Sequence, residues 1–126
     1  MILIGHKWIN SSCFMKVFSK EDIKNTEINS IVLLEPLVDS IELAKYCQDN
    51  DIPYAVTVSA LNDAIFCNAL EANFIICEED VACVIQPIAQ EYLFDTKILV
   101  LIHDEKQISK IARLGIDGVI FSEAIC

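Results

Sequence analysis

The chain has 126 residues, 54% of them hydrophobic, and its 19 Asp and Glu side chains against 9 Lys and Arg give a formal net charge of −10. A chain of this length typically forms one domain, so we expect a single domain over residues 1–126. The negative charge would repel phosphate backbones and anionic lipid, which excludes nucleic acid and membrane surfaces as predicted partners.

The hydrophobic fraction of 54% is above that of an ordinary soluble domain, and only 3 glycines and 3 prolines interrupt it. A small domain has a high ratio of surface to volume and cannot bury all of its apolar side chains. Some apolar surface should therefore be covered by another chain. The composition predicts a homo-oligomer or a complex with a protein partner.

The first 30 residues predict two short strands and one helical turn. The strands are MILIG (1–5) and FMKVF (14–18), and the polar loop HKWINSSC between them is too short for a helical crossover. The segment SKEDIKN predicts a helical turn that begins at Ser19. The start of the chain lacks the features of a signal peptide or a membrane span.

From residue 30 onward, short apolar runs alternate with segments of helical periodicity. The runs are SIVLLE (30–35), YAVTVS (54–59), NFIICE (73–78), KILVLIH (97–103) and GVIFSE (118–123). Such runs are typical of strands buried on both faces. The intervening segments carry apolar residues three and four apart, most clearly at Val81, Val84, Ile85 and Ile88. This alternation predicts an α/β fold with a parallel sheet of about five strands and helical crossovers, plus the two short N-terminal strands.

Prolines and a glycine mark the boundaries of these units. Pro36 and Pro53 enclose one predicted helix, and Gly115 follows the last one. If strand order follows chain order, right-handed crossovers put every helix on one face of the sheet. The other face is also apolar and must be covered by N-terminal strands that close a barrel-like curve, by a second copy, or by helices if the strand order reverses. A half-barrel and an open flavodoxin-like sheet both satisfy this requirement.

The six cysteines form no CxxC pair and mostly lie within apolar runs. They are Cys13, Cys47, Cys67, Cys77, Cys83 and Cys126. This pattern predicts buried free thiols rather than disulfides or a metal site. We therefore expect a reducing, cytoplasmic location.

The last segment, LGIDGVIFSEAIC, resembles the final βα unit of phosphate-holding (β/α)-barrel enzymes such as tryptophan synthase alpha subunits and phosphoribosylanthranilate isomerases. The pattern G-x-D-G-V-I-x-G-S-A-I of those enzymes is matched at Gly115, Asp117, Gly118, Val119, Ile120, Ala124 and Ile125. The resemblance implies a TIM-barrel-like architecture. The family's phosphate-gripping Gly-Ser is Ser122-Glu123 here, and a carboxylate at that point would repel a phosphate dianion, so the resemblance does not carry over a phosphate site.

Parallel sheets bind ligands beyond the carboxyl ends of their strands. The candidate ligand residues at those ends are His6, Glu35, Cys77, Glu78, His103, Asp104 and Glu123. One hypothesis is a divalent metal site with His103, Asp104 and Glu78 as ligands. The other is that the carboxylates only cap helices, since Asp104, Glu105 and Glu78 each precede a predicted helix. The pattern identifies no cofactor.

Three further interpretations concern single residues. Cys77 could pair with His103 as a nucleophile and base, although the neighbouring acids disfavour its thiolate. Trp8 is predicted to anchor its loop to the core. Lys45 and Lys97 stand apart from the strand ends, so we expect no lysine or arginine among the ligand residues.

Two function hypotheses follow. The first is a non-catalytic domain that assembles with itself or another protein and binds a small uncharged or cationic ligand at the acidic strand ends. The alternative is a small metal-dependent lyase or hydrolase of barrel type that uses His103, Asp104 and Glu78. Whether the protein is an enzyme stays open between them.

Overall fold

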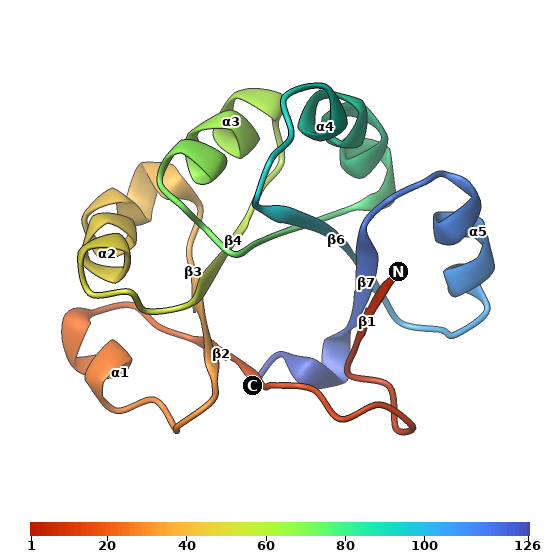
Figure 1. Ribbon diagram of the computed structural model, residues 1–126. Helices are drawn as coiled ribbons and strands as arrows, with labels where there is room; N and C mark the ends of the chain where they lie inside the picture. The colour runs from red at the N-terminus through yellow and green to blue at the C-terminus, as the bar shows by residue number, and fades with distance from the viewer.

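Seven strands and five helices alternate along the chain in the computed structural model, which describes residues 1–126 (Figure 1). The strands are β1 (Ile2–Ile4), β2 (Phe14–Lys16), β3 (Ile31–Leu34), β4 (Tyr54–Thr57), β5 (Phe74–Cys77), β6 (Lys97–Ile102) and β7 (Gly118–Phe121). The helices are α1 (Lys20–Lys24), α2 (Leu37–Asp49), α3 (Leu61–Ala69), α4 (Glu79–Glu91) and α5 (Gln107–Arg113), followed by a 3-10 helix, η1 (Ser122–Ala124). The structure contains no helix whose length and hydrophobicity would let it span a membrane.

All seven strands are parallel, and their order across the sheet is β1-β7-β6-β5-β4-β3-β2. From β2 to β7 this order follows the chain, and the sheet curls into a half-barrel with the helices outside it (Figure 1). Right-handed crossovers between sequential neighbours place the helices on one face in this way. The half-barrel prediction is confirmed, and the open flavodoxin-like form is wrong because the strand order does not reverse.

The predicted count of about five strands in the parallel sheet is too low, because β1 and β2 join it as well. The sequence predicts both N-terminal strands. The loop between them is too short for the helical crossover that two neighbouring parallel strands would need. The structure places the two strands at opposite edges instead, with β1 beside β7 and β2 beside β3. The loop between them therefore crosses from one edge of the curled sheet to the other.

Local signals in the sequence mark several boundaries correctly. The Ser19 side chain accepts a hydrogen bond from the Asp22 backbone N–H and so caps α1. Pro36 immediately precedes α2, and Pro53 immediately precedes β4. Gly115 follows the end of α5 with a φ of 74°, a left-handed conformation that glycine adopts without steric cost.

The inner face of the curled sheet is filled by apolar side chains. Eight buried residues form this inner cluster, one from each strand and one from η1: Ile4, Phe14, Leu33, Ala55, Ile76, Leu99, Ile120 and Ala124. The interior is therefore a packed core and not a pore. The interiors of complete (β/α)-barrels are packed in the same way. Of the three expected ways to cover this face, the structure has the first in part, since β1 and β2 extend the curl at its two edges and the residues after β7 lie between them.

The second core lies between the sheet and the helices. It contains 25 buried residues, among them Val56, Ile75 and Ile98, which alternate along their strands with residues of the inner cluster. Because both faces are buried, the strands are apolar at both parities. This outer cluster accounts for most of the core.

Gly118 lets β1 approach β7 closely. The two strands pair with Ile2 opposite Gly118, and a Cβ atom on Gly118 would lie 2.6 Å from the Ile2 Cβ and would also collide with the Ile2 carbonyl oxygen. A side chain at this position would separate the strands. The position of β1 in the sheet thus depends on a residue without a side chain.

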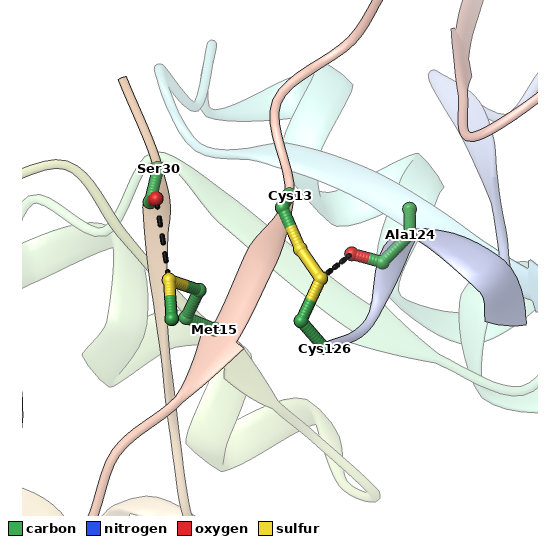
Figure 2. The surroundings of a disulfide bond; sticks show 5 residues. All are labelled: Cys13, Met15, Ser30, Ala124 and Cys126. Carbon is green, nitrogen blue, oxygen red and sulfur yellow. Dashed lines mark hydrogen bonds between the residues drawn. A yellow bond between two sulfur atoms is a disulfide. The ribbon is translucent and has the colours of Figure 1, made fainter. Parts of the chain in front are cut away.

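The residues after β7, termed the seam (122–126), fill the gap between β1 and β2. Phe14 and Ile125 form a parallel bridge, and the Cys126 N–H donates to the Phe14 carbonyl at 2.9 Å. A disulfide between Cys13 and Cys126 joins the seam to the start of β2 (Figure 2). The prediction of free thiols is therefore wrong for this pair. The two cysteines are 113 positions apart in the sequence, and the curl of the sheet brings them together. The other four cysteines are free.

Reduction of the Cys13–Cys126 disulfide should lower the free energy of unfolding by about 2–4 kcal/mol, because the crosslink restricts the unfolded chain over a long loop. Cys126→Ser should have the same effect and should remove the sensitivity to reductant. Cys83→Ser is the matched control, since Cys83 is an exposed free thiol. Denaturant unfolding with and without a dithiol reductant measures these changes. Equal midpoints for the oxidised and reduced protein would contradict this role of the crosslink.

Candidate functional site

The carboxyl ends of the parallel strands meet at one end of the curled sheet, termed the mouth. Side chains alternate along a strand, so the residue two positions after an inner-cluster residue also belongs to the inner face. At six strands the residue in this position is polar: Lys16 and Thr57 lie within β2 and β4, and His6, Glu35, Glu78 and Ser122 follow just after the ends of β1, β3, β5 and β7. In β6 it is Leu101, with His103 two positions further on. The inner cluster thus ends at the mouth in a layer of polar groups.

Two hollows that share no residue with each other open at the mouth. The acidic hollow has a volume of about 400 Å³ and is lined by Gly5, His6, Lys7, His103, Asp104, Glu105, Phe121 and Glu123. The lysine hollow has a volume of about 210 Å³ and is lined by Lys16, Val17, Phe18, Leu33, Leu34, Glu35, Pro36 and Thr57. The first follows β1, β6 and β7, and the second follows β2, β3 and β4.

His6 organises the acidic hollow through both of its ring nitrogens. Its Nδ1 accepts a hydrogen bond from the Trp8 backbone N–H at 3.1 Å, and its Nε2 lies 2.9 Å from Glu105 Oε2. A nitrogen that accepts cannot carry the proton, so these contacts assign the proton to Nε2, which donates to Glu105. The ring edge also packs on Phe121, with 5.4 Å between the ring centroids. His6 therefore holds the β1 and β6 loops together and has no free nitrogen for a ligand.

Trp8 does not anchor its loop to the core, which corrects the prediction for this residue. The residue is 79% exposed, and its ring contacts His6 in a T-shaped arrangement with the ring centroids 5.0 Å apart, while Lys7 Nζ lies 6.0 Å from the centroid of the indole. The loop is held instead by polar contacts, in which Gly5 N–H donates to Ser11 Oγ at 2.9 Å. Because those contacts fix the loop, the indole is left as an exposed aromatic surface beside the acidic hollow.

His103 presents the available imidazole of the acidic hollow. Its Nδ1 lies 3.3 Å from Ser122 Oγ, and its Nε2 has no hydrogen-bond partner in the protein. Its backbone N–H donates to Gln107 Oε1 at 3.2 Å, which ties the loop after β6 to the first residue of α5. The His103 ring is exposed and is therefore free to bind a ligand through Nε2.

The acidic residues near the mouth have different roles. Asp104 Oδ1 accepts a hydrogen bond from the Lys106 backbone N–H at 2.9 Å, just before α5. Glu105 is the acceptor for His6. Glu78 immediately precedes α4, but its side chain makes no capping hydrogen bond. Helix capping thus does not account for all of the carboxylates.

The fold does not bring the ligands of the hypothetical metal site together. No group of three or more His, Cys, Asp and Glu side chains is placed to hold a metal ion. His103 and Asp104 line the acidic hollow together with Glu123, whereas Glu78 and Glu35 do not line it. Glu35 lines the lysine hollow instead.

Cys77 is the last residue of β5 and so lies at the mouth, but its side chain faces the outer cluster, which argues against its place among the candidate ligand residues. It follows the inner residue Ile76 by one position, so it points into the outer cluster, where it is 3% exposed. Its Sγ contacts the Leu99 carbonyl oxygen at 3.8 Å. Burial and the nearby Glu78 and Asp80 carboxylates raise the pKa of the Cys77 thiol to about 12. A buried thiol that stays protonated cannot serve His103 as a nucleophile.

The expectation that the mouth lacks lysine is also wrong. Lys16 lines the lysine hollow and Lys7 lines the acidic one. The alternation of side chains in FMKVF could have predicted Lys16 at the mouth. Phe14 is buried on the inner face, and Lys16, two positions later, lies on the same face. Thr57 follows from the same alternation and was missed for the same reason.

The chain matches no protein-family model, and no curated protein is similar to it. The geometry of the mouth is therefore the basis for a functional proposal.

The three buried free thiols should make the protein lose stability as the pH rises above about 9. Burial raises the pKa of Cys47 to about 11 and those of Cys67 and Cys77 to about 12, from an ordinary value of 9.0. Between these values the unfolded thiols ionise while the folded ones stay protonated, so alkaline pH stabilises the unfolded state. Below about pH 9 this contribution to stability is fully present.

Denaturant unfolding across this pH range measures the loss. Replacing Cys47, Cys67 and Cys77 together by alanine should make the decrease in unfolding free energy shallower, whereas Cys83→Ala should leave its slope unchanged. The same slope in the triple variant and in the unmodified protein would refute the assignment.

Proposed function

We propose that the protein is a non-catalytic module that binds a small uncharged or cationic ligand in the acidic hollow and assembles with itself. The observation that supports ligand binding is the composition of that hollow. Three carboxylates, those of Asp104, Glu105 and Glu123, surround it with one ammonium group, that of Lys7. The excess of negative charge favours a cation and disfavours an anion.

His103 and Trp8 add two kinds of ligand contact. The free Nε2 of His103 can accept a hydrogen bond from an ammonium or hydroxyl group, or donate one to an uncharged acceptor. The exposed indole of Trp8 can attract a cation through its ring face. These groups suit a small organic cation or a polyol.

Exposed apolar side chains on three adjacent helices support self-assembly. Val38 on α2, Phe66 on α3 and Val84 on α4 are 88%, 60% and 56% exposed, and Figure 1 places these helices side by side outside the sheet. A second copy is a suitable partner because it carries the same apolar surface, so one two-fold contact would cover both. The packed inner face no longer calls for a partner, so assembly rests on the helices alone.

A cytoplasmic location is part of the proposal. The four free cysteines, three of them buried, support it. In a reducing compartment we expect the Cys13–Cys126 pair in its dithiol form. The resemblance of the C-terminal unit to phosphate-holding barrel enzymes supports a TIM-barrel-like module without a phosphate site, since Ser122 and Glu123 stand at the phosphate-gripping positions.

Tetramethylammonium chloride should perturb the amide NMR signals of Lys7, His103 and Glu123, and an equal concentration of sodium acetate should not. Glu123→Gln should weaken binding of the cation about two- to fivefold, because it removes one exposed carboxylate from the hollow. Glu91→Gln, at the end of α4 away from the mouth, is the control. Binding of acetate at the same residues would argue against the proposal.

The molar mass in solution should exceed that of one chain, 14.1 kDa. Phe66→Ser combined with Val84→Ser should return it to a single chain, whereas Ile28→Ser, a change at an exposed apolar residue outside these helices, should not. Added salt should strengthen assembly, because it screens the repulsion between copies that each carry a charge of −10. Light scattering measures all three effects, and a single-chain mass for the unmodified protein at high concentration and high salt would disprove self-assembly.

A further inference from the structure

We infer that the lysine hollow is a second binding site, for a small zwitterion such as a free aliphatic α-amino acid. Lys16, Glu35 and Thr57 supply its polar side chains. The site shares no residue with the acidic hollow, so the inference does not depend on the proposed function.

The strand register brings these three side chains together. Lys16 pairs with Leu33 across β2 and β3, and Leu33 pairs with Ala55 across β3 and β4. Thr57 follows Ala55 by two positions within β4 and so lies on the inner face, and Glu35 comes directly after β3 and lines the same hollow. An ammonium, a carboxylate and a hydroxyl group from three neighbouring strands therefore border one hollow.

The two opposite charges of the hollow are not used within the protein. The ion pairs of the structure are His6 with Glu105 and Lys110 with Glu79, and neither includes Lys16 or Glu35. An ammonium and a carboxylate that line the same hollow without pairing can each receive a ligand group of opposite charge. A zwitterion supplies both, since its carboxylate can bind Lys16 while its ammonium binds Glu35.

The backbone around the hollow is held in place before a ligand binds. Ser40 is buried and its Oγ–H group contacts the Glu35 carbonyl at 2.7 Å and the Pro36 carbonyl at 3.2 Å. These contacts accompany a break in α2, where Ser40 has non-helical angles of φ −133° and ψ 16°. On the opposite side, the Val17 N–H donates to the Leu33 carbonyl at 3.1 Å. A prearranged site loses less entropy when it binds a ligand.

The remaining lining sets the size and polarity of the ligand. Leu33 belongs to the inner cluster and Phe18 is an exposed side chain at the edge, whereas the side chains of Val17 and Leu34 belong to the outer cluster. The volume of about 210 Å³ is below the roughly 300–1,000 Å³ of sites for drug-sized molecules, so the hollow suits a small metabolite. The apolar side chains of Leu33 and Phe18 beside two opposite charges favour an amino acid with a short aliphatic side chain.

Isothermal titration with L-valine, isobutyrate and isobutylamine tests the inference, because the last two compounds each retain one of the two charges of valine. Valine should bind more tightly than either analogue. Lys16→Met and Glu35→Gln should each weaken valine binding about two- to fivefold, because each removes one exposed charged partner. Isobutyrate binding should respond to Lys16→Met alone, and the isobutylamine binding that remains in the Glu123→Gln variant should respond to Glu35→Gln alone.

Lys97→Met is the matched control and should leave valine binding unchanged. Lys97 is at the amino end of β6, and the mouth is at the carboxyl ends of the strands. His103→Ala should also leave valine binding unchanged, which separates this site from the acidic hollow. Circular dichroism verifies folding, and Lys16→Gln replaces Lys16→Met if the latter unfolds. The inference fails if valine does not bind, if it binds equally well to the Lys16 variant, or if isobutyrate binds as tightly.

Discussion

The structure depends on one requirement, that a parallel sheet with apolar side chains on both faces must exclude water from both. Sequential right-handed crossovers place the helices on one face only, so the sheet can satisfy the requirement on the other face by curling. The inner cluster, with one residue from each strand, is the result of that curl. The mouth follows from it, because the same alternation that buries the inner cluster brings polar side chains from all the strands to one end. Both hollows are consequences of how the sheet buries its interior.

Local patterns in the sequence predict the elements of the fold well and the site only in part. The apolar runs predict β3 to β7, and Ser19, Pro36 and Gly115 mark boundaries that the structure has. The candidate ligand residues were chosen by their position after each strand, which treats every residue near a strand end alike. What distinguishes these residues is the face of the sheet toward which each side chain points, and consecutive residues point to opposite faces. This is why Cys77 is buried under the helices while Lys16 lines a hollow.

Contacts between distant parts of the chain could not be predicted from local patterns. Cys13 and Cys126 lie in unremarkable surroundings in the sequence and meet only because the seam reaches β2. The exposure of Trp8 has a similar origin, since the loop that carries it spans the gap between the two sheet edges and is fixed by Ser11 and not by its aromatic side chain. The position of β1 beside β7 is another such contact. Each of these features requires the complete curl and leaves no periodic signal.

The pairing of β1 with β7, which the small Gly118 permits, bears on the order in which the strands assemble. Ile2 pairs with Gly118, so β1 has no partner strand until nearly the whole chain has taken its place. Neighbouring units from β2 to β7 can form by short loop closures, whereas the pairing of β1 closes one of the longest loops available and is entropically the least favourable. We therefore infer that the N-terminal strand is the last to dock and the first to detach, and that the edge of β7 is the least persistent part of the sheet.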